Sequence, residues 1–412
     1  MPLVLEELQR VSPAAEIWWD SSPLDFPRWR NRFLKEAPDN ETRDRWARQL
    51  DRFLCPGTPG ASLVRGITTN PSLVAQSILA SPDVWGREIQ DIIRDQSMPD
   101  VESTFRLVYE EALRRATARM LPMWEASQGR FGWVSGQLDP RYMFDADLML
   151  EQALRIARIS PNLMVKVPGS AAGYEVIRRL VGHGISVNNT LSYTVPQFLA
   201  CAEAVESGLG EARRRGVAVD RWRAVFTHMI GRFGANSDLR HEAATRGIDL
   251  TPADIRWAEV AILKRIHRRI REHGHPVKPL VSSLEVDDPA TVPGTLSMHL
   301  EQSAGGAIAY TCKPQFVADV MRRDHELPAF APDAIEQEVP AQVLEKLMWL
   351  PSFHSAYDPY GMSVDEFAHY GSFISTYAEV LGNTRKLLDF IAHRFQTMTD
   401  SAQPLLLSAS TR

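Results

Sequence analysis

Cysteine, lysine and long apolar stretches are all scarce in this sequence of 412 residues. Its three cysteines lie far apart without C-x-x-C spacing, so we expect neither a disulfide framework nor a metal site. No apolar run reaches the roughly 18 residues of a membrane span, and the acidic, amphipathic first ten residues do not resemble a signal peptide. The net charge of −5 provides no basic surface for nucleic acid. We therefore expect a cytoplasmic protein that binds neither membranes nor nucleic acid.

The few lysines are informative because the chain otherwise relies on arginine. Only seven of the 46 basic residues are lysine, which leaves 39 arginines. Lys166 lies in the apolar segment LMVKVP (163–168), which is typical of a core strand. Burial would lower the pKa of this lysine and leave a neutral amine that can attack a carbonyl. The alternative is a structural lysine paired with a buried carboxylate such as Asp20.

Short β-branched segments alternate with amphipathic helical stretches along most of the chain. This alternation is the signature of parallel βαβ units, and eight candidate strands predict a (β/α)₈ barrel of the α/β class. The candidate strands are residues 15–19, 63–68, 131–138, 163–167, 184–188, 223–228, 278–283 and 306–310.

Helix signals separate these strands and then change in character past residue 325. Asn70 followed by Pro71 predicts the start of one helix, and Thr251 with Asp254 predicts a capping box for another. Proline-spaced pieces and a further helix over 371–396 follow the last strand. We therefore expect one domain with extra N- and C-terminal helices. It would comprise a barrel over 1–325 and a helical extension over 326–412 packed on it.

Polar residues end the predicted strands, which is where the active site of such a barrel lies. Lys166 ends the fourth of these strands. The others, in strand order, are Asp20, Thr69 and Asn70, Gln137 and Asp139, Asn188 and Thr190, Thr227 and His228, and Ser282 and Ser283.

Five segments, in the same order along the chain, resemble motifs of the transaldolase family. They are WWD (18–20), GITTNPS (66–72), VKVP (165–168), GISVNNTL (184–191) and MIGR (229–232). One such motif alone would be weak, whereas five in register are specific, and the resemblance extends over residues 15 to 310.

The resemblance implies a role for each matching residue. Lys166 would attack the ketone of a donor sugar and form a Schiff base, and Asp20 would take the proton of the donor C4 hydroxyl. Asn70 and Asn188 would hold donor hydroxyls, while Thr190 would position the catalytic water. We also expect Thr227, Arg232, Ser283 and Glu285 to bind substrate. Asn70 could instead simply cap its helix, and Asn188 and Thr190 could merely end a strand.

Two positions depart from the family pattern. The family has glutamate at the place of Gln137, where it relays protons through a water; glutamine can bind this water but cannot accept its proton. In the related fructose-6-phosphate aldolases a tyrosine shares that task, but Met229 stands there in this chain. Glu285 occupies the second place, where the family has a basic residue for the sugar phosphate. We expect Glu285 to pair with Arg232, so that a substrate phosphate gains little.

The resemblance implies transfer of a dihydroxyacetone unit from a ketose, or ketose phosphate, to an aldehyde, with Gln137 among the catalytic residues. Two alternatives remain open: a Schiff-base aldolase that releases dihydroxyacetone, and a catalytically weakened barrel kept as a binding or scaffold protein. We expect sugar or sugar-phosphate substrates and no cofactor. The C-terminal helices could cover the surface of a homodimer or form a lid over the site.

Overall fold

Eight parallel strands close into a barrel in the computed structural model, which describes residues 3–55, 58–95 and 100–407. The strands pair in chain order, and β8 closes the sheet onto β1. The predicted (β/α)₈ barrel is therefore confirmed. The strands are β1 (Glu16–Asp20), β2 (Val64–Thr68), β3 (Trp133–Gln137), β4 (Leu163–Pro168), β5 (Val187–Ser192), β6 (Ala224–His228), β7 (Lys278–Val281) and β8 (Ala309–Cys312).

Two strands begin about three residues later than the sequence indicates. β5 begins at Val187 because Gly184 adopts a left-handed conformation (φ 73°) and the amide of Ile185 still bonds to Leu180 of the preceding helix. Gly305, also left-handed (φ 87°), lies in the turn before β8, which begins at Ala309. As a result, Asn188 and Thr190 lie inside β5 rather than at its end.

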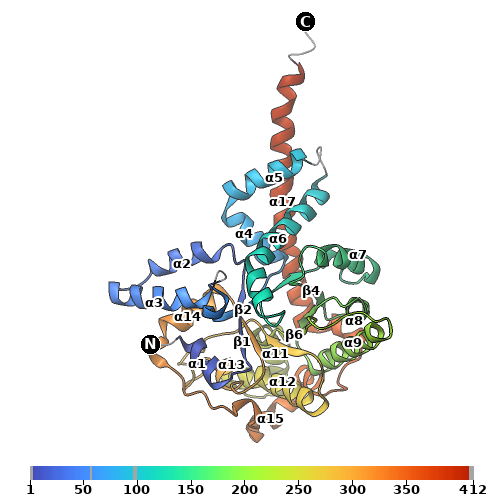
Figure 1. The fold of residues 1–412 in the computed structure, drawn as a ribbon. Coiled ribbons are helices and arrows are strands. Elements are labelled where there is room, and N and C mark those ends of the chain that lie inside the picture. The colour runs from blue at the N-terminus through green and yellow to red at the C-terminus, as the bar shows by residue number, and fades with distance from the viewer. Residues whose placement is uncertain (1–2, 56–57, 96–99, 408–412) are drawn as a thin grey trace.

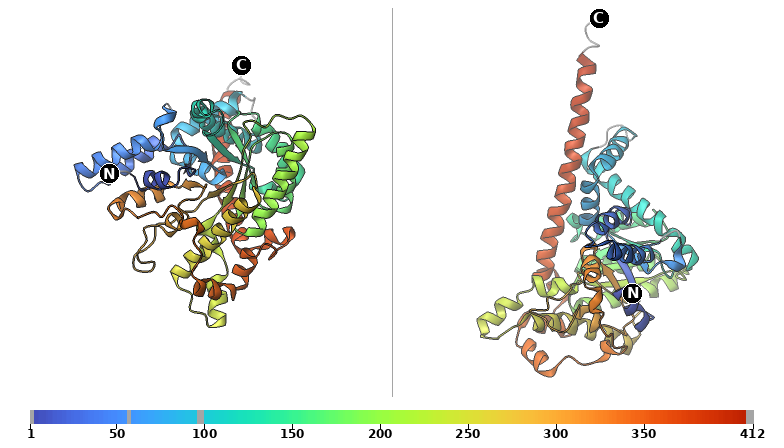
Figure 2. Two further views of the ribbon diagram at one scale, coloured as in Figure 1. Left: turned by 60° about the horizontal axis from the view of Figure 1, so that its bottom comes forward. Right: turned by 90° about the vertical axis from the view of Figure 1, so that its left-hand side faces the viewer.

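Helices surround the barrel and fill the connections between strands (Figures 1 and 2). Those that precede or follow the strands are α1 (Val4–Val11), α2 (Phe26–Leu34), α3 (Asn40–Phe53), α4 (Pro71–Ala80), α5 (Pro82–Asp95), α6 (Val101–Ala126), α7 (Ala146–Ala157), α8 (Ala171–Gly182), α9 (Val195–Arg214), α10 (Ile230–Asn236), α11 (Leu239–Arg246), α12 (Pro252–His273), α13 (Met298–Glu301) and α14 (Pro314–Arg322). The two predicted helix starts are confirmed, since Asn70 caps α4 and Thr251 forms the capping box of α12.

The interior of the barrel is filled by apolar side chains below the level of the pocket. Trp18, Trp133 and Met164 pack together there with Val225 and Leu280. Gly66 makes room for the largest of them, because a Cβ at this position would lie 2.5 Å from the Trp18 ring. Side chains two residues further along each strand point the same way and form the next layer up. That layer is the floor of the pocket.

The chain continues after the barrel into α15 (Ala341–Met348), α16 (Pro351–Tyr357) and α17 (Gly371–Leu407). The predicted helix over 371–396 is thus confirmed and runs further. α17 packs against α4, α6 and α10, and its far end extends beyond the body of the molecule (Figure 2). Phe373, Leu387 and Ile391 on this helix are fully buried. The division of the chain at residue 325 stays a prediction.

Candidate active site

A pocket of about 670 Å³ opens at the carboxyl ends of the strands. Every strand contributes a polar residue to this pocket, either from near its carboxyl end or from just beyond that end. These residues are Asp20, Thr68, Gln137, Lys166, Thr190, Thr227, Ser282 and Thr311. Asn70, Arg232, Ser283 and Glu285 line the pocket as well. The pocket thus brings together nine of the ten predicted site residues, and only Asn188 does not line it.

Lys166 lies on the floor of this pocket with only 5% of its surface exposed. Its strand neighbours Val165 and Val167 face the surrounding helices, and Met164 lies one layer below it in the barrel. Burial lowers the pKa of Lys166, while the negative charge of Asp20 opposes that shift. The amine is therefore easier to deprotonate than that of an ordinary lysine.

Asp20 ends β1 and is held by hydroxyl groups. The Thr68 hydroxyl donates to Asp20 Oδ1 over 2.6 Å, and Thr68 is itself hydrogen-bonded to Thr311. Burial raises the pKa of Asp20, and the positive charge of Lys166 acts against this rise. A carboxyl group with a raised pKa both accepts and returns a proton more readily near neutral pH.

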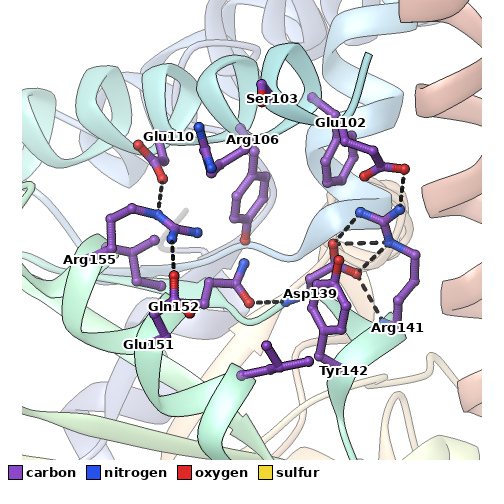
Figure 3. A pocket seen from close by; sticks show the side chains of 14 residues that line it. Glu102, Ser103, Arg106, Glu110, Asp139, Arg141, Tyr142, Glu151, Gln152 and Arg155 are labelled. Atoms are coloured by element: carbon purple, nitrogen blue, oxygen red, sulfur yellow. Dashed lines mark hydrogen bonds and ion pairs between the residues drawn. The ribbon is translucent and has the colours of Figure 1, made fainter. Parts of the chain in front are cut away.

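A second, smaller pocket lies between α6 and α7, and residues of its wall hold the segment that follows β3 (Figure 3). The Tyr109 hydroxyl donates to the backbone carbonyl oxygen of Gln137 over 2.7 Å. Asp139 then anchors the following turn: its amide bonds to Gln152, and its carboxylate binds Arg141, which also reaches Glu102 (Figure 3). These contacts fix where β3 ends and aim the Gln137 side chain into the main pocket.

Asn188 differs from the other predicted site residues because it is fully buried and does not line the pocket. Its amide nitrogen donates to the Ser135 hydroxyl over 2.8 Å, and its oxygen accepts from Thr227 over 2.6 Å. It therefore ties β3, β5 and β6 together and orients Thr227, which does line the pocket. Its predicted role in binding a donor hydroxyl stays a prediction.

The position of Asn70 is compatible with both roles that the sequence left open. Its side-chain oxygen accepts a bond of 2.8 Å from the Leu73 amide and so caps α4. The residue also lines the pocket, and its NH₂ group is a separate donor that this cap does not use. Capping and substrate binding are therefore compatible.

Arg232 and Glu285, the charged residues at the rim of the pocket, pair differently from our expectation. Arg232 does not pair with Glu285; its two terminal nitrogens bind both oxygens of Glu379 on α17, at 2.5 and 2.9 Å. Glu285 instead binds Lys313, at 3.0 Å. The expected Arg232–Glu285 pair is thus wrong, because α17 and the start of α14 bring closer partners that the sequence pattern did not place here.

The loop after β7 approaches α10 closely. Ser283 has a left-handed backbone (φ 60°), and a Cβ at Gly231 would lie only 2.1 Å from the Ser283 carbonyl oxygen. Gly231 is therefore required for this contact, which places Arg232 beside Ser283 and Glu285 in one wall.

Sequence reasoning missed the wall that α17 supplies. Thr376, Glu379 and Val380 line the pocket, at the i, i+3 and i+4 spacing of a single helix face. No motif marked them. Lys313, just after β8, also lines the pocket. Lys278 begins β7 and pairs with Glu16, away from the site.

The described part of the chain shows neither a cluster of metal ligands nor a membrane-spanning helix. No three His, Cys, Asp or Glu side chains gather there in a way that would hold a metal ion. None of the helices in the described ranges is long and apolar enough to cross a membrane.

The fold and site together define a (β/α)₈ barrel with a buried lysine on the floor of a polar pocket. The family model described as Transaldolase/Fructose-6-phosphate aldolase matches residues 60–339, which is more than half of the chain. The chain therefore belongs to the transaldolase/fructose-6-phosphate aldolase family. The predicted family membership is thereby confirmed.

Individual relatives match a shorter segment. A protein named transaldolase from Mycobacterium tuberculosis is 31% identical over 179 residues, or 43% of this chain and 47% of the relative. Transaldolases from Mycobacterium marinum and Mycolicibacterium paratuberculosis are 31% and 33% identical over 181 residues, 43% of this chain and 48% of each relative. The chain spans about half the length of the curated relatives it matches.

Proposed function

We propose that this protein is a Schiff-base enzyme that transfers a dihydroxyacetone unit from a ketose to an aldehyde, with Lys166 as the nucleophile. The observation that carries the proposal is the lysine itself, a nearly buried amine with a lowered pKa at the floor of an open polar pocket. Burial disfavours the charged ammonium form, so the neutral amine that attacks a carbonyl becomes available.

The reaction would begin with attack of Lys166 Nζ on the donor ketone, followed by loss of water to give an iminium ion. Asp20 would accept the proton of the C4 hydroxyl while the C3–C4 bond breaks and its electron pair moves toward the iminium nitrogen. An aldehyde would leave, and the enamine would remain on Lys166. The enamine carbon would then attack an acceptor aldehyde, whose new hydroxyl takes the proton back from Asp20. Water finally releases the product from Lys166.

Several neighbours support these steps. The raised pKa of Asp20 suits a group that accepts and returns one proton in each cycle. Thr190 lines the pocket one inward-facing position beyond Asn188 and would hold the water, and Asn70 would bind a donor hydroxyl through its free NH₂ group. Gln137 would bind the same water without accepting its proton. The iminium ion is itself the electron sink, so the chemistry calls for no metal or organic cofactor.

A product assay separates this function from its alternatives. The enzyme would be mixed with fructose and erythrose, and the products would be identified by mass spectrometry. Transfer yields a new ketose, whereas an aldolase yields free dihydroxyacetone and no new ketose. A scaffold protein yields neither product, and that result would contradict the proposed function.

A further inference from the structure

We propose that Glu379 of α17 serves as a built-in anion at Arg232, so that the pocket selects neutral polyhydroxy substrates over phosphorylated ones. This inference rests on the proposed function for the identity of the reaction. It assigns a specificity-determining role to a residue that lies outside the family-matched residues 60–339.

The geometry of the pair is that of a carboxylate bound by a guanidinium fork. Both terminal nitrogens of Arg232 are used, one to each oxygen of Glu379. The pair raises the pKa of Arg232 and lowers that of Glu379. The donors that would bind two oxygens of a phosphate are therefore already occupied by two carboxylate oxygens.

The helix that carries Glu379 is fixed in place rather than loosely attached. Thr376 and Val380 lie on the same pocket-facing side and are buried. One turn further on, Asn383 donates to Ser72 in the first turn of α4. Since these contacts hold the helix against the barrel mouth, Glu379 is presented to Arg232 before any substrate arrives.

Glu285, in the same wall as Arg232, neutralises a second cation. It pairs with Lys313 at 3.0 Å, so Arg232 and Lys313 each have a carboxylate partner. The exposed Arg32 of α2 also lines the pocket. A phosphate dianion at Arg232 or Lys313 would either displace the paired carboxylate or lie beside it, so neither of these residues offers it an unpaired charge. A terminal hydroxyl, by contrast, can bond to the Glu379 carboxylate without disturbing the pair, since a carboxylate accepts several hydrogen bonds.

The residues around the two pairs suit a neutral polyol. Side-chain amides and hydroxyls make up much of the remaining wall: Asn70, Gln76, Asn236, Ser283 and Gln315. These groups donate and accept hydrogen bonds without net charge, as successive hydroxyl groups of a sugar require.

The test titrates inorganic phosphate into the full-length protein by calorimetry at pH 8, where phosphate is a dianion. Glu379→Gln should increase phosphate affinity by about tenfold or more, because one freed guanidinium gains charge-assisted bonds to the anion. The matched control is Asp389→Asn, which removes an α17 carboxylate paired with Arg385 on the same helix. It should leave affinity unchanged. Adding Arg232→Gln to the Glu379→Gln variant should abolish the gain.

Three results would each overturn the inference. The first is that Glu379→Gln binds phosphate no more tightly than wild type, whether both proteins bind it or neither does. The control could gain as much affinity, or the gain could survive the loss of Arg232. A parallel arm compares borohydride trapping of fructose and fructose 6-phosphate. Wild type should trap fructose faster than fructose 6-phosphate, and Glu379→Gln should shift the preference toward the phosphate. If no imine forms with either sugar, the proposed function fails, while the phosphate titration still decides the role of Glu379.

Discussion

Gln137 and Lys166 are direct partners on neighbouring strands of the barrel. The β3–β4 ladder places Gln137 opposite Lys166, and the amide just after Gln137 donates to the Lys166 carbonyl over 3.0 Å. Both side chains line the same pocket. The residue at the expected relay position is therefore adjacent to the nucleophile and differs from a proton-accepting glutamate only in its neutral amide.

Changing Gln137 to glutamate tests whether this neutral amide limits catalysis. Gln137→Glu should raise turnover with fructose, because a carboxylate beside Lys166 can accept the proton of the water that glutamine can only hold. General acid–base assistance contributes roughly 10²–10⁴-fold, so even partial recovery is measurable by steady-state kinetics.

The matched control is Gln76→Glu, which adds the same charge at an exposed position of the pocket wall on α4. This variant should show no gain in turnover. An unchanged or lower turnover for Gln137→Glu would mean that the site is built around a neutral residue and that Asp20 alone carries protons.

The coupling between Asp20 and Lys166 predicts a shift in the pH at which Lys166 becomes reactive. Reductive methylation with formaldehyde needs the neutral amine, so its midpoint at Lys166 should lie below the ordinary lysine value of 10.5. Asp20 favours the ammonium form, so Asp20→Asn should lower the midpoint further. Mass spectrometry of the Lys166 peptide across a pH series measures both midpoints. A midpoint that rises in Asp20→Asn would contradict this coupling.

Glu16 at the opposite end of the barrel should make stability depend on pH. Burial alone would raise its pKa, but Arg223 and Lys278, each 2.7 Å away, outweigh burial and lower the pKa to about 2. A lowered pKa stabilises the fold above the unfolded value of 4.5, and this contribution is lost as pH falls toward 2. Glu16→Gln should therefore cost up to roughly 3 kcal/mol of unfolding free energy at pH 7.

Chemical denaturation at pH 7 and pH 3 measures this difference, which should shrink at the lower pH. Glu175→Gln breaks an exposed pair with Arg178 and serves as the control, with an expected cost below about 1 kcal/mol. A Glu16→Gln cost that does not change with pH would assign the effect to packing instead of charge.

The sequence was sufficient for the barrel and for the floor of its pocket. Strand patterning is local, and inward-facing residues recur every second position, so Asp20, Gln137 and Lys166 could be placed together from the order of strands alone. The same logic misplaced the start of β5, because the left-handed turn at Gly184 depends on how α8 ends.

The ion pairs at the rim of the pocket could not be predicted in this way. Glu379 lies 147 residues from Arg232, and their contact depends on the path of α17 across α4, α6 and α10. No periodicity within α17 distinguishes a carboxylate that faces a pocket from one that faces solvent. The partner of Glu285 was likewise decided by where β8 ends, which places Lys313 within reach.

Covalent trapping at Lys166 tests the central claim most directly. The protein would be reduced with borohydride in the presence of fructose or dihydroxyacetone, and the modified peptide would be identified by mass spectrometry. Lys264 provides a demanding control, since it is also nearly buried and burial lowers its pKa to about 8, yet it bonds to the Ala334 carbonyl outside the pocket. We predict an adduct on Lys166 that Lys166→Ala abolishes without loss of folding and that Lys264→Ala leaves intact. An adduct that persists in Lys166→Ala would contradict the account and move the nucleophile to another lysine, with Lys313, which also lines the pocket, the next to test.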